Sequence, residues 1–160
     1  MDGATGRDGT EDGATGRDGT EGGAAGRDAA PGRVELTRAA EDLLLRLADR
    51  HGPLMFHQSG GCCDGSSPMC YPRGEFRVGA SDVLLGRVAG GTPFWMSADQ
   101  YAYWKHTHLT VDVVPGRGGG FSLEAPEGVR FLLRSRLLTD EEARALEDGP
   151  PLPTGADPDA

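Results

Sequence analysis

The residues with the clearest chemical potential form a short run rich in cysteine and glycine, Ser59 to Cys70. The run holds every cysteine of the chain, at positions Cys62, Cys63 and Cys70. Thiolates bind Zn²⁺, iron and iron–sulfur clusters, and glycine lets backbone N–H groups point at sulfur. His57 precedes the run and adds an imidazole. We therefore expect a zinc or iron site, with Cys62 as the primary ligand and the other three residues beside it.

Two other interpretations of the same run remain open. The spacing is not a standard zinc spacing, and adjacent cysteines rarely chelate one ion together. A reactive thiol at Cys62 or Cys63 would need a lowered pKa, which His57 or His106 could favour and Asp64 would oppose. Alternatively, the cysteines serve as small apolar residues in a structural loop.

A pair of histidines, His106 and His108, supplies secondary candidates for metal ligands. In a strand, residues two apart face the same side, which brings both imidazoles to one face. At the end of a helix, the same residues would instead interact with the helix dipole.

Charge and composition divide the chain into one folded part and two tails. Residues 2–21 contain the unit DGATGRDGTE twice, without a large apolar residue to bury. Ordering such a segment costs roughly 1–2 kcal/mol per residue in backbone entropy with nothing to offset it. We expect a disordered tail over residues 1–33, a single domain over residues 34–142, and a helix end with a disordered acidic, proline-rich tail over residues 143–160.

The composition also excludes several classes of partner. The net charge of −9 comes from the two tails, because the segment that they flank, residues 34–138, contains eleven acidic and eleven basic residues. No basic face is available for nucleic acid, and a single lysine, Lys105, argues against a polybasic membrane patch. No stretch approaches the ~20 apolar residues of a membrane helix, and no apolar leader is present. Three clustered cysteines favour a reducing compartment. We expect a cytoplasmic protein, with the oligomeric state left open.

The apolar periodicity predicts an α+β fold. Leu36, Ala40, Leu43, Leu44 and Leu47 form one stripe of a helix over residues 36–50, for which Thr37 is the N-cap. A capping box at Ser97 and Gln100 starts a short inserted helix, and Thr139 caps a terminal one. Strands are expected at residues 54–57, 82–88, 92–96, 109–114 and 129–138, with a further strand beginning at 121–123 and a loop over 59–70. The fold class is a small, mostly antiparallel β domain with an N-terminal helix and a short inserted helix.

Three segments resemble a bacterial family of unknown activity. They are MFHQSGGCCDGSSPMCYP (residues 55–72), YWKHTHLTVDVVPGRGGGFSLEAPEG (103–128) and RFLLRSRLLTDEE (130–142). Together they resemble domain of unknown function 779 over about residues 35–142. That family is often encoded beside aldehyde dehydrogenases. The resemblance implies a link to aldehyde metabolism and an aldehyde dehydrogenase as a partner.

A more distant similarity links the chain to the HesB-type (A-type) iron–sulfur carrier fold. The residues that match its pattern are Cys62, Gly119, Phe121 and Pro126. The carriers complete their ligands with a C-terminal Cys-Gly-Cys, where this chain has residues 132–135, LLRS. The resemblance implies a HesB-like fold, in which any metal site is rebuilt from Cys63, Cys70 and histidines.

Taken together, these patterns predict a small accessory protein. It would bind a metal or an iron–sulfur cluster through the Cys-rich run and associate with an aldehyde dehydrogenase. One alternative is a thiol-redox or Cys-nucleophile enzyme that acts on a small electrophile such as an aldehyde. The other is a metal-free protein that binds the dehydrogenase.

Overall fold

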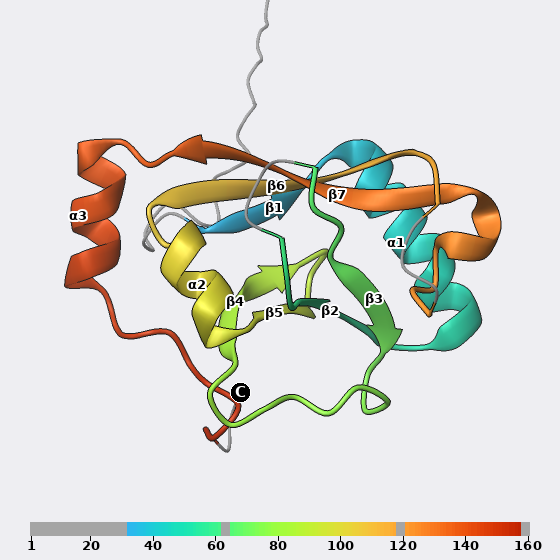
Figure 1. The fold of residues 1–160 in the computed structure, drawn as a ribbon, viewed down its shortest axis with the longest axis horizontal. Helices are drawn as coiled ribbons and strands as arrows, with labels where there is room; N and C mark the ends of the chain where they lie inside the picture. The colour runs from blue at the N-terminus through green and yellow to red at the C-terminus, as the bar shows by residue number, and fades with distance from the viewer. Residues whose placement is uncertain (1–31, 62–64, 118–120, 158–160) are drawn as a thin grey trace, which may run out of the picture. The chain divides into compact units, whose positions relative to one another are not determined.

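The computed structural model describes residues 32–61, 65–117 and 121–157 (Figure 1). Over these ranges the chain forms two small sheets and three α-helices, which confirms the predicted α+β class. The predicted N-terminal tail, residues 1–33, lies outside the described residues except for its last two positions. The elements in chain order are β1 (Val34–Leu36), α1 (Arg38–His51), β2 (Leu54–Gln58), β3 (Met69–Pro72), β4 (Val83–Val88), β5 (Thr92–Met96), α2 (Ala98–Trp104), β6 (Thr107–Pro115), the 3-10 helix η3 (Ala125–Glu127), β7 (Val129–Leu137) and α3 (Asp140–Asp148).

Helix α1 begins and ends as its sequence predicts. The Thr37 hydroxyl accepts a hydrogen bond from the backbone N–H of Ala40, and Gly52 ends the helix with φ 81°. Glycine suits that position because residues with a Cβ rarely adopt a positive φ. The buried residues of the helix are Ala40, Leu43, Leu44 and Leu47. Leu36, predicted as a helical residue, lies instead in β1, where it pairs with Val111 of β6.

The first sheet has the strand order β1-β6-β7, with β1 parallel and β7 antiparallel to β6. The predicted strand beginning at residues 121–123 is wrong, because β7 is the partner of β6 and Ser122 lies in a turn. The Ser122 hydroxyl accepts from the backbone N–H of Cys70 at 2.9 Å. This hydrogen bond joins the turn to β3, a strand of the second sheet.

The second sheet has the strand order β3-β2-β5-β4, and the predicted strands at 54–57, 82–88 and 92–96 are confirmed as β2, β4 and β5. Strand β2 is parallel to β5, whereas the two outer pairs are antiparallel. The end of the predicted loop is wrong, since residues 69–72 form β3. Pro68 and Pro72 give this segment the local signature of a loop. Pairing with β2 overrides that signature.

The hydrophobic core draws on the inward sides of both sheets and on α1 and α2. Three phenylalanines, Phe56, Phe94 and Phe131, lie fully buried, and the Phe56 ring is 5.0 Å from Phe131 and 5.5 Å from Phe94. The short helix α2 contributes Trp104, whose indole N–H donates to the Gln100 side chain at 3.1 Å. Both sheets are thereby fixed to one apolar centre. No helix of the described ranges has the length and apolar character needed to span a membrane.

The predicted capping box at Ser97 forms only in part. The Ser97 hydroxyl accepts from the backbone N–H of Gln100 at 3.2 Å, as expected. The return bond does not form, because the Ser97 N–H donates to the carbonyl of Gln58 and the Gln100 side chain accepts from Trp104. A complete capping box does occur at Thr139, which exchanges hydrogen bonds with Glu142.

The segment after α3 differs from the polar tail predicted from sequence. The backbone N–H of Leu84 donates to the backbone carbonyl of Pro153 at 2.9 Å. The N–H of Gly155 donates to the backbone carbonyl of Asp82, also at 2.9 Å. The N–H of Ala156 donates to Ala80 at 3.2 Å. The segment thus pairs with the chain around the start of β4, whose edge offers unpaired backbone groups. Periodicity gives no signal for such pairing, because the segment has no apolar repeat.

A C-terminal deletion tests this pairing. Removing residues 153–160 eliminates three backbone hydrogen bonds, and we expect the free energy of unfolding to fall by about 2 kcal/mol. Urea denaturation monitored by circular dichroism would measure it. The matched control removes only residues 158–160, which leaves all three bonds in place. Equal stability of the two truncated proteins would contradict the structural role of the segment.

Candidate functional site

The structure separates two of the four ligands predicted for a metal site, His57 and Cys70. Cys62 and Cys63 lie outside the described residues. Cys70 lies in β3, where it pairs with Phe56, and both side chains belong to the core. His57 is the next residue of β2. Because successive side chains of a strand point to opposite faces, the His57 and Cys70 side chains lie on opposite sides of the sheet. They do not fit as ligands of a single ion.

The secondary histidine candidates are separated as well. His106 is exposed in the turn after α2, and only His108 lies in β6. The His108 Nε2 atom is 3.7 Å from a carboxylate oxygen of Glu35. Across the described ranges, no three His, Cys, Asp or Glu side chains come together as a metal site.

The surroundings of Cys70 indicate a structural thiol. The side chain is fully buried, and burial raises the pKa of the thiol well above its usual range, which the negative charge of Glu124 raises further. Glu124 is itself fully buried; its carboxylate accepts from the Ser122 hydroxyl and, at 3.3 Å, from the backbone N–H of Phe131. This cluster joins β3, the 122–124 turn and β7. Because metal binding and nucleophilic attack both require a thiolate, the surroundings favour the structural interpretation for Cys70.

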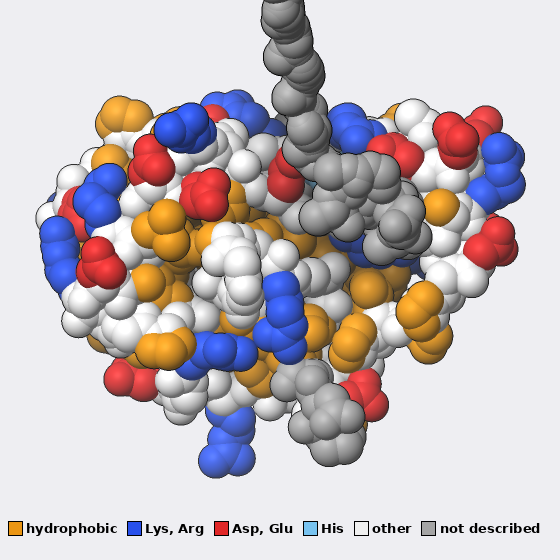
Figure 2. Space-filling model, turned by 180° about the vertical axis from the view of Figure 1, so that it is seen from behind, with side chains coloured by type: hydrophobic (Ala, Val, Ile, Leu, Met, Phe, Trp, Pro, Cys, Tyr) orange, Lys and Arg blue, Asp and Glu red, His pale blue; other side chains and the backbone are white. Residues whose placement is uncertain are grey.

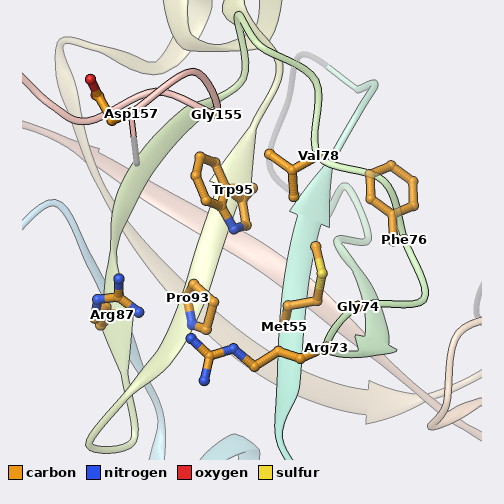
Figure 3. A pocket seen from close by; sticks show the side chains of 10 residues that line it. All are labelled: Met55, Arg73, Gly74, Phe76, Val78, Arg87, Pro93, Trp95, Gly155 and Asp157. Atoms are coloured by element: carbon orange, nitrogen blue, oxygen red, sulfur yellow. The ribbon is translucent and has the colours of Figure 1, made fainter. Parts of the chain in front are cut away.

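The outer face of the second sheet carries a different cluster, which is our candidate site. Met55, Leu84 and Trp95 are buried on this face, away from the core. This face is covered by residues 73–82 and by the C-terminal segment, residues 153–157. A hollow of about 280 Å³ remains between this cover and the sheet (Figure 3). We call this space the outer hollow. Its lining residues are Met55, Arg73, Gly74, Phe76, Val78, Arg87, Pro93, Trp95, Gly155 and Asp157.

Two arginines stand at one end of the outer hollow. In Figure 3 the side chains of Arg73 and Arg87 lie near Pro93, with Trp95 farther along the hollow. Both arginines are exposed, and the structure gives neither an ion pair within the described ranges. The acidic side chain in the lining, Asp157, accepts instead from the backbone N–H of Thr154 at 2.7 Å. One end of the hollow is therefore positively charged and its floor is apolar.

His57 lies beside two residues that line the outer hollow, Trp95 and Phe76. In the parallel pairing of β2 with β5, His57 is the register partner of Trp95. The His57 Nε2 atom is 2.8 Å from Asp82 Oδ2, and its Nδ1 atom is 2.6 Å from Ser59 Oγ. The Phe76 ring, which also lines the hollow, lies 4.4 Å from the imidazole between ring centroids. Both nitrogens of a nearly buried imidazole are thus bonded.

Sequence reasoning missed most of this site. It singled out His57 as a metal ligand and gave no role to Ser59, Asp82 or the two arginines. The pattern His-x-Ser at the end of a strand could have indicated the contact between His57 and Ser59, because residues two apart in a strand share a face. Asp82 lies 25 positions after His57, and no local pattern connects the two.

A thiol titration tests the assignment of Cys70. In a Cys62→Ser/Cys63→Ser double variant, Cys70 is the only thiol. We expect no reaction with Ellman's reagent at pH 8 while the protein is folded, because burial holds the thiol protonated, and one equivalent after unfolding in guanidinium. The wild-type chain serves as the control for reagent access. Rapid titration of the folded double variant would contradict a structural thiol.

A comparison with curated proteins yields no match to the chain. The family described as Domain of unknown function (DUF779) matches residues 43–137. That range runs from α1 to β7 and includes His57, Ser59, Asp82 and both arginines of the outer hollow. It covers more than half of the 160 residues, and the chain therefore belongs to this family of unknown function.

Proposed function

We propose that the protein binds a small organic acid, a carboxylate with an apolar body, in the outer hollow. The observation that carries the proposal is the placement of Arg73 and Arg87 at one end of an apolar floor, with no ion pair to either in the described residues. A guanidinium donates two parallel hydrogen bonds to a carboxylate, which makes arginine well suited to this anion. Two neighbouring positive charges also repel each other, and an anion between them relieves that repulsion.

The floor of the outer hollow suits the apolar body of such a ligand. Met55 and Trp95 are 2% and 6% exposed, so each presents only a limited surface to the hollow. Removing apolar surface from water contributes roughly 25 cal/mol per Å². The volume of about 280 Å³ lies just below the range of about 300–1,000 Å³ typical of ligand sites, which favours a small acid over a drug-sized molecule.

The aldehyde dehydrogenase link implied by the family resemblance is compatible with this ligand class. Oxidation of an aldehyde gives a carboxylic acid, which is ionised at neutral pH. We propose that the chain acts as an accessory protein beside such an enzyme and binds an acid of this kind. The partner itself is tested separately, by co-purification with a candidate dehydrogenase.

Titration with matched acids and alcohols tests the binding site. Calorimetry with hexanoate and benzoate should show saturable binding, whereas hexanol and benzyl alcohol should bind much more weakly because they lack the charge. Arg73→Gln and Arg87→Gln should each weaken carboxylate binding by about tenfold, the loss expected for one charge-assisted hydrogen bond. The change in Trp95 fluorescence provides a second measurement in a Trp104→Phe background.

Arg77→Gln is the matched control, because Arg77 is exposed on the same covering segment and does not line the outer hollow. It should bind both acids as the wild type does. Equal weakening by Arg77→Gln, or equal affinity for acids and alcohols, would refute a specific carboxylate site.

Metal or cluster binding remains a separate proposal, now limited to the Cys62–Cys63 pair. Elemental analysis and an absorption spectrum of protein purified anaerobically without chelators would test it. If the proposal holds, near-stoichiometric zinc or iron disappears in Cys62→Ser and persists in Cys70→Ala, since the Cys70 side chain faces the core. Metal-free wild-type protein with three titratable thiols after unfolding would end this proposal.

A further inference from the structure

We infer that Ser59, His57 and Asp82 form a nucleophilic relay that hydrolyses monoesters or monothioesters of short dicarboxylic acids. The relay stands on its own geometry. The preference for an acyl group with a free carboxylate rests on the proposed function of the outer hollow.

The three side chains are connected as a nucleophile, its base and the group that orients the base. Ser59 Oγ lies 2.6 Å from His57 Nδ1, and His57 Nε2 lies 2.8 Å from Asp82 Oδ2. An ionised Asp82 can only accept, so Nε2 carries the proton and Nδ1 is left to accept from the Ser59 hydroxyl. The roles match those of a Ser-His-Asp triad, with the two ring nitrogens exchanged.

Burial differs along the relay in the way that the chemistry requires. The His57 and Asp82 side chains are 4% and 13% exposed, whereas Ser59 is exposed. The base is shielded from water while the hydroxyl is open to a substrate. Asp82 is held in place by the backbone N–H of Gly79 at 2.9 Å, and the Phe76 ring packs against the imidazole.

The register of the sheet indicates which acyl length to test first. Arg87 pairs with Pro93, and His57 pairs with Trp95 two residues farther along β5. Two residues of a strand span about 6.6 Å. This is the separation of the two levels along the strands, and β5 lies between Arg87 and His57. We place the free carboxylate of a short dicarboxylic acid on Arg73 and Arg87, and its ester carbonyl at the Ser59 hydroxyl beside the His57 imidazole.

The reaction proceeds in two balanced halves. Ser59 Oγ attacks the carbonyl carbon while its proton passes to His57 Nδ1. The bond to the leaving oxygen or sulfur then breaks, and the same proton goes to the leaving group, which departs as an alcohol or thiol. Water attacks the acyl-serine with His57 as the base again, which releases the dicarboxylic acid and restores the Ser59 hydroxyl. Asp82 acts as a positioning residue that stabilises the imidazolium formed in each half.

The test measures hydrolysis of 4-nitrophenyl hydrogen succinate and neutral 4-nitrophenyl butyrate in the Cys62→Ser/Cys63→Ser background, which removes thiol reactions. Ser59→Ala should lower kcat/KM for both esters by about 100-fold or more. A fluorophosphonate probe should label Ser59 and no other residue, as read by peptide mass spectrometry. Arg73→Gln and Arg87→Gln should raise KM for the succinyl ester alone, and Arg77→Gln should change neither substrate.

Asp82 needs a measurement that loss of structure would not reproduce. In Asp82→Asn, the ¹⁵N chemical shifts of His57 should report a change of tautomer, with kcat reduced and the circular dichroism spectrum unchanged. Asp82→Glu should restore part of kcat.

The outcomes separate the two proposals. Hydrolysis and labelling at Ser59 without a succinyl preference would keep the relay and remove the arginine site. Carboxylate binding in the titration without hydrolysis or labelling would overturn the relay, and the Ser59 bond would then only close the end of β2.

Discussion

The structure depends on one strand, β2, which is buried on both faces. All five of its residues are buried, and it has a neighbouring strand on each side. Phe56 faces the phenylalanine core, and Met55 and His57 face outwards. A strand of this kind requires a cover on each side. The first sheet and α1 cover one side, and residues 73–82 with the C-terminal segment cover the other (Figure 1).

Placing a histidine in the outward row imposes a second requirement. A buried imidazole needs partners for both nitrogens, because an unsatisfied polar group costs roughly 1–3 kcal/mol. Ser59 and Asp82 provide them and thereby tie the end of β2 to the start of β4. On the inward side, Glu124 plays a comparable part through hydrogen bonds rather than ion pairs, since its carboxylate accepts from the Ser122 hydroxyl and the Phe131 N–H.

The space-filling view shows how the charged residues are distributed on one face of the molecule. In Figure 2 arginine and lysine side chains are scattered among acidic ones, with no continuous basic surface on that side. Several of the arginines elsewhere are paired, such as Arg134 with Asp112 at 2.9 Å and Arg136 with Glu142 at 2.8 Å. Against this background, the positions of Arg73 and Arg87 beside an apolar floor are what sets the outer hollow apart, rather than any excess of positive charge.

The parts of the fold that sequence could predict are those whose signal is local. Each such signal depends on residues that are close together in the sequence. Examples are the apolar stripe of α1, its Thr37 cap and the apolar runs of β2, β4 and β5. Strand β3 and the C-terminal pairing arise only from partners distant in sequence, and both were assigned as irregular. The first of these errors bears on Cys70 alone, because a loop residue can join a metal site with Cys62, Cys63 and His57, whereas a residue of β3 whose side chain faces the core cannot.

The candidate site could not be predicted from sequence for the same reason: its residues come from segments that are distant in the chain. The way in which these segments meet also explains the geometry of the site. Its floor consists of strand residues whose spacing the register fixes, and its walls are two irregular segments. A Cβ added at Gly155 would collide with the Gly79 carbonyl, so one wall packs directly on the other. Sites on strands are held more precisely than sites on loops. The floor residues therefore set the distance between the arginine end and His57, whereas the packing of the walls determines how open the outer hollow is to a ligand.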